Sequence, residues 1–269
     1  MKKNELGHRA RKRFGQNFLH DDNIINQIVS AIHPLASEKI VEIGPGLGAI
    51  TTKILQATDQ IDVIELDRDI IPKLIKNCNN HPNLTVHQAD ALKFDIGQIC
   101  TKTSPKVRVI GNLPYNISTP ILFHLFSSIE HIEDMHFMLQ KEVVQRMAAN
   151  PGNKKWGRLS IMVQYYCQVE SLFLVPPHAF RPAPKVDSAI VRLTPYTTPP
   201  HSVIDKALME KIVVNAFSQR RKTLRNALKK WLSIEDFEHL QIDPKWRPEQ
   251  LSVEAFVNIA NYLHHKSQN

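Results

Sequence analysis

Short apolar runs at regular spacing dominate the first half of the chain, and polar residues or glycines follow each of them. The runs are rich in β-branched side chains and too short to be buried helices. Helical patterns separate them, as in βαβ units, so the sequence predicts an α/β fold with a mostly parallel sheet. The predicted strands comprise residues 39–43, 61–64, 84–87 and 107–110.

Chemically useful residues follow these strands, at the sheet edge where open α/β folds bind ligands. Gly44 and Gly46 form a turn that would let the backbone approach a ligand, before a helix expected to reach residue 57. Glu65, 21 residues after Gly44, is suitably spaced to bind the two hydroxyls of a ribose. Asp90, beside small residues, could accept a hydrogen bond from an adenine amine. At this point an NAD-dependent dehydrogenase remains an alternative, because the glycine turn and acid also describe a dinucleotide-binding fold.

The fourth strand leads into the loop at residues 111–116, Gly-Asn-Leu-Pro-Tyr-Asn. Asn112 offers an amide, Pro114 a carbonyl and Tyr115 an aromatic face. These groups suit a planar amine, with two acceptors for its hydrogens and a ring to stack on. The same composition is also ordinary for a turn. A dehydrogenase would have no need for this loop, and the catalytic His or Lys that it would want in a second domain is not evident.

Two other segments each allow two interpretations. Residues 16–19, Gln-Asn-Phe-Leu, precede a helical pattern, and alone they favour a hydrophobic staple at the start of that helix. Residues 176–188 hold four prolines around Phe180. The prolines could stiffen the backbone and hold the ring outward, or they could belong to a connector with a buried phenylalanine.

Charge and cysteine usage narrow the class of protein. A net charge of +8 over 269 residues favours a polyanionic partner, nucleic acid before membrane. The three cysteines are far apart and no metal-binding spacing occurs, so neither a disulfide framework nor a metal site is expected. No apolar run reaches the roughly 18 residues of a membrane span, and the basic N-terminal arm lacks the apolar centre of a signal peptide. The sequence therefore predicts a cytoplasmic protein.

A Pro- and Thr-rich linker at residues 195–201 predicts two domains, an α/β catalytic domain at residues 1–199 and a helical domain at residues 200–269. Apolar residues at helical spacing between 224 and 232 predict one helix. Six basic residues without an acid fall within residues 220–230, and this unmixed cluster predicts a phosphate-binding surface. They are Arg220, Arg221, Lys222, Arg225, Lys229 and Lys230.

The chain resembles the S-adenosylmethionine-dependent methyltransferases, whose glycine motif stands here as Val-Glu-Ile-Gly-Pro-Gly at residues 41–46. More narrowly, it resembles the rRNA adenine-N6 dimethyltransferases of the KsgA (RsmA) type, from residue 15 to about residue 263. The signatures of that family stand here at residues 16–19, 64–67 (Ile-Glu-Leu-Asp), 90–92 (Asp-Ala-Leu), 112–115 (Asn-Leu-Pro-Tyr), 180–188 (Phe-x-Pro-x-Pro-Lys-Val-Asp-Ser) and 216–225.

The resemblance implies a Rossmann-like class I methyltransferase sheet, with one antiparallel strand and a small all-α C-terminal domain. It also implies S-adenosylmethionine as the methyl donor, without a metal. The implied cofactor-binding residues are Asn17, Leu19, Gly44, Gly46, Glu65, Asp90 and Asn112. The implied cofactor contacts of Asn17 and Leu19 replace the staple interpretation of residues 16–19. The implied catalytic residues are Asn112, Pro114, Tyr115 and Phe180, the two rings stacking on a flipped adenine. The implied RNA-binding residues are Arg220, Arg221, Lys222 and Arg225.

The implied reaction is dimethylation of the exocyclic N6 of two adjacent adenosines near the 3′ end of 16S rRNA in the small ribosomal subunit. That activity belongs to rRNA processing and ribosome biogenesis, and a monomer without an obligate protein partner is expected. Two alternatives remain, an Erm-type 23S rRNA adenine dimethyltransferase and a non-catalytic ribosome-assembly factor on the same fold. The motif around Phe180 and the Gln-Arg-Arg-Lys cluster at residues 219–222 argue against the first, and the intact cofactor motifs argue against the second.

Overall fold

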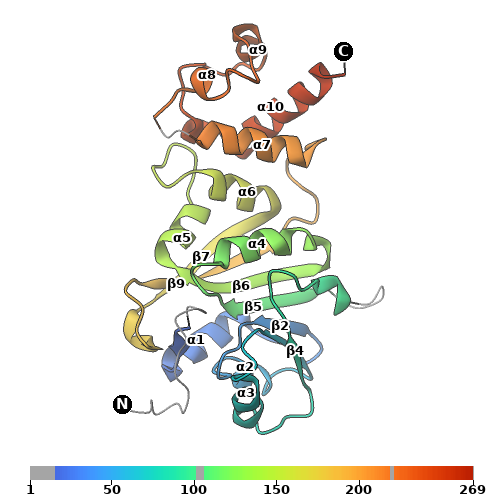
Figure 1. The fold of residues 1–269 in the computed structure, drawn as a ribbon, viewed down its shortest axis with the longest axis vertical. Coiled ribbons are helices and arrows are strands. Elements are labelled where there is room, and N and C mark those ends of the chain that lie inside the picture. The colour runs from blue at the N-terminus through green and yellow to red at the C-terminus, as the bar shows by residue number, and fades with distance from the viewer. Residues whose placement is uncertain (1–15, 101–105, 219–220, 269) are drawn as a thin grey trace. The chain divides into compact units, whose positions relative to one another are not determined.

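The computed structural model describes residues 16–100, 106–218 and 221–268. The chain forms two compact units (Figure 1). The first contains residues 1–144 and 170–195, and the second contains residues 145–169 and 196–269. Residues 145–169 thus share a compact unit with the C-terminal helices, although the predicted catalytic domain included them. The functional boundary at residues 199 and 200 stays a prediction.

A seven-stranded sheet forms the centre of the first unit, in the order β4-β3-β2-β5-β6-β9-β7. The strands from β4 to β6 are parallel, and β9 is antiparallel to β6, which confirms the predicted sheet. The strands are β2 (Lys39–Ile43), β3 (Ile61–Glu65), β4 (Leu84–Gln88), β5 (Val107–Asn112), β6 (Ile132–Gln140), β7 (Cys167–Val175) and β9 (Ser188–Pro195).

The order of the strands reverses at β2, which has β3 on one side and β5 on the other. In the β2–β5 pair Glu42 lies opposite Ile110, so the two carboxyl ends emerge next to each other. A Cβ atom on Gly44 would lie 3.9 Å from the carbonyl oxygen of Asn112. The fold therefore brings the glycine turn and the Asn-Leu-Pro-Tyr loop together at the kind of reversal where open α/β sheets bind ligands.

A separate two-stranded sheet pairs β1 (Phe18–Leu19) with β8 (Phe180–Arg181) in antiparallel register. Leu19 lies opposite Phe180, and the backbone N–H of His20 donates to the carbonyl of Ala179 at 3.0 Å. The segment that contains Asn17 is therefore held by a long-range strand pair as well as by its own helix.

The helices of the first unit begin with α1 (Asp22–Ile32), which Asp21 caps by accepting hydrogen bonds from two backbone N–H groups. The helix after the glycine turn, α2 (Thr51–Ile54), has four residues, and the prediction that it reaches residue 57 was wrong. Tight i→i−3 hydrogen bonds such as that from Gln56 N–H to Lys53 O replace further α-helical turns. The remaining helices are α3 (Ile71–Asn77), α4 (Ser118–Phe126) and α5 (Lys141–Met147), the last of which crosses into the second unit.

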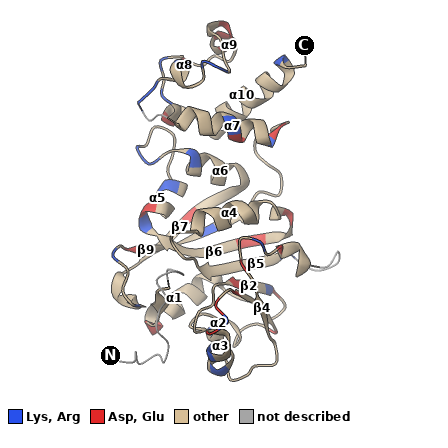
Figure 2. Ribbon diagram, viewed as in Figure 1, with Lys and Arg blue, Asp and Glu red and all other residues tan. Residues whose placement is uncertain are grey.

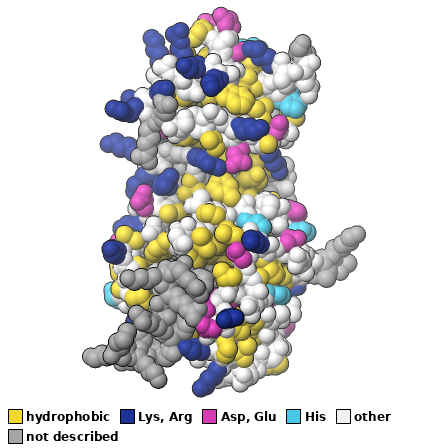
Figure 3. Space-filling view, in the orientation of Figure 1, with side chains coloured by type: hydrophobic (Ala, Val, Ile, Leu, Met, Phe, Trp, Pro, Cys, Tyr) yellow, Lys and Arg dark blue, Asp and Glu magenta, His cyan; other side chains and the backbone are white. Residues whose placement is uncertain are grey.

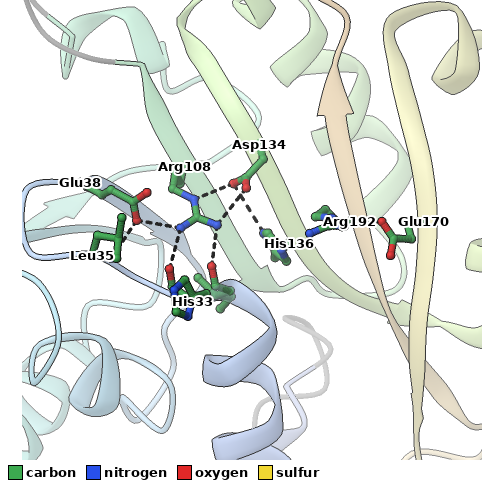
Figure 4. Close-up of polar contacts among 9 residues, drawn as sticks. His33, Leu35, Glu38, Arg108, Asp134, His136, Glu170 and Arg192 are labelled. Carbon is green, nitrogen blue, oxygen red and sulfur yellow. Dashed lines mark hydrogen bonds and ion pairs between the residues drawn. The ribbon is translucent and has the colours of Figure 1, made fainter.

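Arg108, near the start of β5, ties the end of α1 to the sheet (Figure 4). Its guanidinium donates to the carbonyl oxygens of Ile32 and His33, at 2.6 and 3.3 Å. It also donates to Glu38 at 2.7 Å and to both carboxylate oxygens of Asp134 on β6, at 3.0 and 2.9 Å. These contacts satisfy helix-end carbonyls that have no partner inside the helix.

The second unit is mainly helical, as the sequence predicted. The nine residues from 224 to 232 do not form the single predicted helix, because α8 ends after four residues. Arg225 and Lys229 would be like charges four residues apart on that helix, with no acid nearby to offset their repulsion. The helices are α6 (Arg158–Tyr166), α7 (Lys206–Phe217), α8 (Leu224–Ala227), α9 (Ile234–His239) and α10 (Val253–Lys266).

Candidate active site

A cavity of about 360 Å³ lies at the carboxyl ends of β2, β3 and β5, within the first unit. The loops after these strands line it, together with β1 and the loop after β4. Its lining includes every predicted cofactor and catalytic residue except Phe180. They are Asn17, Leu19, Gly44, Gly46, Glu65, Asp90, Asn112, Pro114 and Tyr115.

The glycine turn presents bare backbone to the cavity. Gly44 and Gly46 have φ values of +67° and +57°, which glycine adopts far more readily than other residues. A Cβ atom on Gly46 would lie 3.2 Å from the ring of Phe18, so a side chain there would crowd β1. The turn therefore needs glycine for its conformation at both positions and for close packing at the second.

Two backbone N–H groups orient the carboxylate of Glu65. The N–H of Asp67 donates to Oε1 at 2.8 Å, and the N–H of Gly46 donates more weakly to Oε2 at 3.4 Å. Burial raises the pKa of Glu65, and these hydrogen bonds oppose that rise. The result is a fixed acceptor on the cavity wall, directly beside the glycine turn.

A second buried acid, Glu42, was quoted in the glycine motif but received no role from the sequence. It is 2% exposed, lines the cavity and accepts a hydrogen bond from the Thr51 hydroxyl at 2.6 Å. Burial raises its pKa from 4.5 to about 7, the Thr51 hydrogen bond opposes the rise, and the charge of Glu65 adds to it. The signal available in the sequence was an acid between two apolar residues, Val41 and Ile43, near the end of a strand.

Asp90 lies in the loop after β4, with Ala89 and Ala91 also lining the cavity. Its Oδ1 accepts a hydrogen bond from the Leu92 N–H at 3.0 Å, which holds the carboxylate in a local turn. The small neighbouring side chains leave the carboxylate room to meet a ligand.

Asn112 is the last residue of β5, and its side-chain NH₂ group donates to the backbone carbonyl of Asn17 at 3.0 Å. Since the nitrogen is held in this way, the amide oxygen remains available as an acceptor. Asn17 is therefore joined to the site through its backbone carbonyl, and its contact with the cofactor stays a prediction.

The two following site residues differ in how their polar groups are used. The carbonyl of Pro114 accepts a hydrogen bond from the Ile117 N–H at 3.1 Å. A carbonyl oxygen has two lone pairs, and one remains for a ligand. The hydroxyl of Tyr115 lies 2.6 Å from that of Ser188.

Phe180 does not line the cavity, although the sequence predicted that its ring faces Tyr115 across the target base. The ring is 2% exposed and packs in an apolar cluster that includes Leu19 and Ile25. With nothing stacked on it, an apolar ring is more stable in such a cluster than in water. Its contact with a base stays a prediction and requires the side chain to move.

The predicted RNA-binding cluster lies in and around α8 of the second unit, where Figure 2 shows several basic positions on the ribbon and Figure 3 shows dark-blue side chains gathered on the surface. Arg221 and Arg225 are exposed and Lys222 is half-buried, whereas Arg220 lies outside the described residues. Lys229 and Lys230 are exposed as well.

Within the described ranges, no group of three or more His, Cys, Asp or Glu side chains is arranged to hold a metal ion. Nor does any helix in the described part of the chain have the length and apolarity needed to cross a membrane.

The strand order, the glycine turn and the acid on the neighbouring strand end define a class I methyltransferase of the Rossmann-like type.

The particular family follows from comparison with known proteins. The sequence profile of the family "Ribosomal RNA adenine dimethylase" matches residues 7–265, and the chain belongs to that family. It is 59% identical over 256 residues to "Ribosomal RNA small subunit methyltransferase A" of Marinomonas sp. (strain MWYL1), covering 95% of this chain and 96% of the relative. The protein of the same name from Pseudomonas aeruginosa is 58% identical, with 95% of each chain covered.

Solved structures show the same fold. A dimethyladenosine transferase from Plasmodium falciparum superposes with a TM-score of 0.78 at 27% identity, covering 93% of this chain and 98% of the other. The 23S rRNA methyltransferase ErmE has a TM-score of 0.71 at 23% identity, covering 92% and 100%, and shows likeness of fold alone.

Proposed function

We propose that this protein transfers methyl groups from S-adenosylmethionine to the N6 atoms of two adjacent adenosines near the 3′ end of 16S rRNA in the small ribosomal subunit. The observation that carries the proposal is the likeness to proteins named ribosomal RNA small subunit methyltransferase A. These relatives are 58–59% identical to this chain, and the alignments cover 95% of it. The protein then works in the cytoplasm as a monomer, during ribosome biogenesis.

The cavity suits the proposed cofactor, which supplies a methyl group on a positively charged sulfonium. Glu65 would accept hydrogen bonds from the ribose hydroxyls, because two backbone N–H groups already hold its carboxylate at the cavity wall. Asp90 would accept one from the adenine amine. The bare backbone at Gly44 would admit the methionine moiety. No metal is needed, since the methyl group is already bonded to a good leaving group.

Asn112 and Pro114 would act on the target amine. The N6 amine of adenine is a weak nucleophile because its lone pair is delocalised into the ring. The Asn112 amide oxygen and the second lone pair of the Pro114 carbonyl would accept the two amine hydrogens. These contacts localise the lone pair and stabilise the positive charge that develops on nitrogen, while alignment lowers the barrier further. We assign no general base, because the proton can leave to water after transfer.

Tyr115 would stack on the target base once the base has left the RNA helix. Phe180 would stack on the opposite face of the base after moving out of its apolar cluster. Each stacking contact is worth about 1–3 kcal/mol, which offsets an unstacking cost of a few kcal/mol. The basic cluster around Arg221, Lys222 and Arg225 would bind RNA phosphates, together with Arg220.

A partition experiment tests the choice of substrate. Unmethylated small and large ribosomal subunits are incubated together with the protein and with S-adenosylmethionine carrying a labelled methyl group. We expect label in the RNA of the small subunit only. Label that appears only in the large subunit would favour the Erm-type activity, and protein that binds small subunits without transferring label would favour an assembly factor.

A further inference from the structure

Ser188 is the first residue of β9, and its side chain is fully buried. The sheet brings it next to the Asn-Leu-Pro-Tyr loop, because Ser188 pairs with Gln140 at the end of β6 and Asn112 pairs with Met138 on the same strand. The N–H of Leu113 continues that pairing by donating to the Met138 carbonyl at 3.2 Å. The loop and the start of β9 therefore lie at the same end of the sheet's strands.

The hydroxyls of Tyr115 and Ser188 are 2.6 Å apart, the short end of the range for O–H···O hydrogen bonds. Tyr115 lines the cavity and Ser188 does not. A fully buried hydroxyl has a strong need for a partner, so the bond holds the far end of the phenol in place. Burial raises the pKa of Tyr115, and the hydrogen bond with Ser188 opposes that rise. The phenol is therefore protonated at neutral pH.

Ser188 is itself rigidly held. Its neighbour Asp187 accepts a hydrogen bond from the Lys141 N–H through its carbonyl, at 3.0 Å, and its carboxylate lies 3.2 Å from the Lys141 ammonium. Holding the Tyr115 oxygen restricts rotation about the Cα–Cβ bond, because that rotation would carry the oxygen away from Ser188. The contact therefore fixes where the ring lies in the cavity wall.

We propose that Ser188 is a positioning residue, which holds the Tyr115 ring in the place at which it stacks on the target base during methyl transfer. This inference rests on the proposed function. Ser188 acts in this way on the methyl-transfer step rather than on binding. RNA affinity comes mainly from phosphate contacts, and the cofactor residues lie elsewhere in the cavity. Loss of the bond should therefore lower kcat more than it changes KM.

The test compares Ser188→Ala, Tyr115→Phe and the double variant, each with saturating labelled cofactor and unmethylated small subunits. We expect each single change to lower kcat about tenfold, and the double change to lower it about tenfold rather than a hundredfold. KM for the subunit and for the cofactor should stay within about twofold. Thr58→Val is the matched control, because it removes a buried hydroxyl hydrogen bond in the same unit, to Ile54 O at 3.1 Å, outside the cavity lining.

Unchanged kcat in both single variants would overturn the role of Ser188, and so would losses that multiply in the double variant. A Thr58→Val protein that loses kcat as strongly would also overturn it, by showing a general effect of lost buried hydrogen bonds. If the unaltered protein transfers no label to small subunits, the proposed function fails and the role of Ser188 fails with it. Transfer by the unaltered protein with unchanged variants rejects the Ser188 role alone.

Discussion

The environment of the buried acid Glu42 changes its ordinary chemistry strongly. The acid lies on β2, beneath the glycine turn, with Thr51 as its hydrogen-bond donor and Glu65 as a nearby negative charge. A folded-state pKa of about 7 lies above the value of 4.5 for a carboxyl group in the unfolded chain. Protonation therefore stabilises the fold, and that stabilisation is complete below about pH 4.5 and is lost as the pH rises through 7.

Replacing Glu42 with Gln tests whether ionisation of Glu42 destabilises the fold. Glutamine keeps an oxygen for the Thr51 hydroxyl but cannot ionise, so the variant avoids the loss of stability at high pH. We expect the free energy of unfolding of Glu42→Gln, relative to the unaltered protein, to improve by roughly 2–3 kcal/mol between pH 5 and pH 8, at about 1.4 kcal/mol per pKa unit. Urea unfolding at both pH values measures the difference. A difference that is independent of pH would contradict the raised pKa.

A change at Asn112 should affect methyl transfer without affecting RNA binding. Its amide oxygen is proposed to contact the reacting amine, whereas the basic cluster that is proposed to bind RNA lies in the other unit. We expect Asn112→Ala to abolish methyl transfer, a loss of at least about 100-fold, while its affinity for small subunits changes less than about threefold. Filter binding and label transfer measure the two properties. Equal loss of both would mean that the loop is a docking element.

Among the elements, α1 depends on a contact that no local pattern indicates. Arg108 joins the end of this helix to two strands, and its partner Asp134 is mostly buried. Burial raises the pKa of Asp134, but the nearby His136 ring and the hydrogen bonds from Arg108 outweigh it and hold the pKa below its usual value. Because α1 follows directly after Asn17 and β1, its placement also supports one wall of the cavity.

Arg108→Met should therefore lower the free energy of unfolding by about 3 kcal/mol, because it leaves a mostly buried carboxylate and the carbonyls at the end of α1 without their donor. The matched control is Arg192→Met, drawn in the same close-up (Figure 4), because the Arg192–Glu170 pair is well exposed. That change should cost less than about 1 kcal/mol. Similar losses in the two variants, measured by urea unfolding, would contradict an anchoring role for Arg108.

The sequence predicted elements well where local pattern and burial agree. The four strands that lead to Gly44, Glu65, Asp90 and Asn112 were confirmed, because apolar runs and the polar or glycine residues after them are local signals. The lengths of α2 and α8 were wrong, since apolar spacing alone does not measure tight turns or repulsion between like charges. The pairing of Leu19 with Phe180 and the contact of Tyr115 with Ser188 join segments far apart in the chain, which spacing along the sequence cannot show.

At the scale of the whole molecule, the two units divide the proposed work. The first holds the cavity with its buried acids, and the second carries exposed basic residues around α8. Within the described residues, no carboxylate forms an ion pair with Arg221, Lys222 or Arg225. Charges without such partners can neutralise phosphates at little cost, and release of counterions then makes RNA binding dependent on salt.

The double change Arg221→Ala with Arg225→Ala should reduce the slope of log affinity against log salt concentration by about 1.5, since each lost phosphate contact contributes about 0.7–0.9. Binding to small subunits is measured over a series of salt concentrations. Lys76→Ala with Lys106→Ala removes the same charge from exposed positions of the first unit and should leave the slope nearly unchanged. Equal reductions in both variants would show an effect of net charge rather than of this cluster.

The proposed activity of this protein is the dimethylation of particular adenosines of the small-subunit RNA. The most direct measurement incubates unmethylated small subunits with the protein and S-adenosylmethionine, then maps the modified nucleosides by mass spectrometry of RNA fragments. We expect N6,N6-dimethyladenosine at two adjacent positions near the 3′ end of 16S rRNA. Methyl groups only at other positions, or none at all on small subunits that the protein binds, would contradict it.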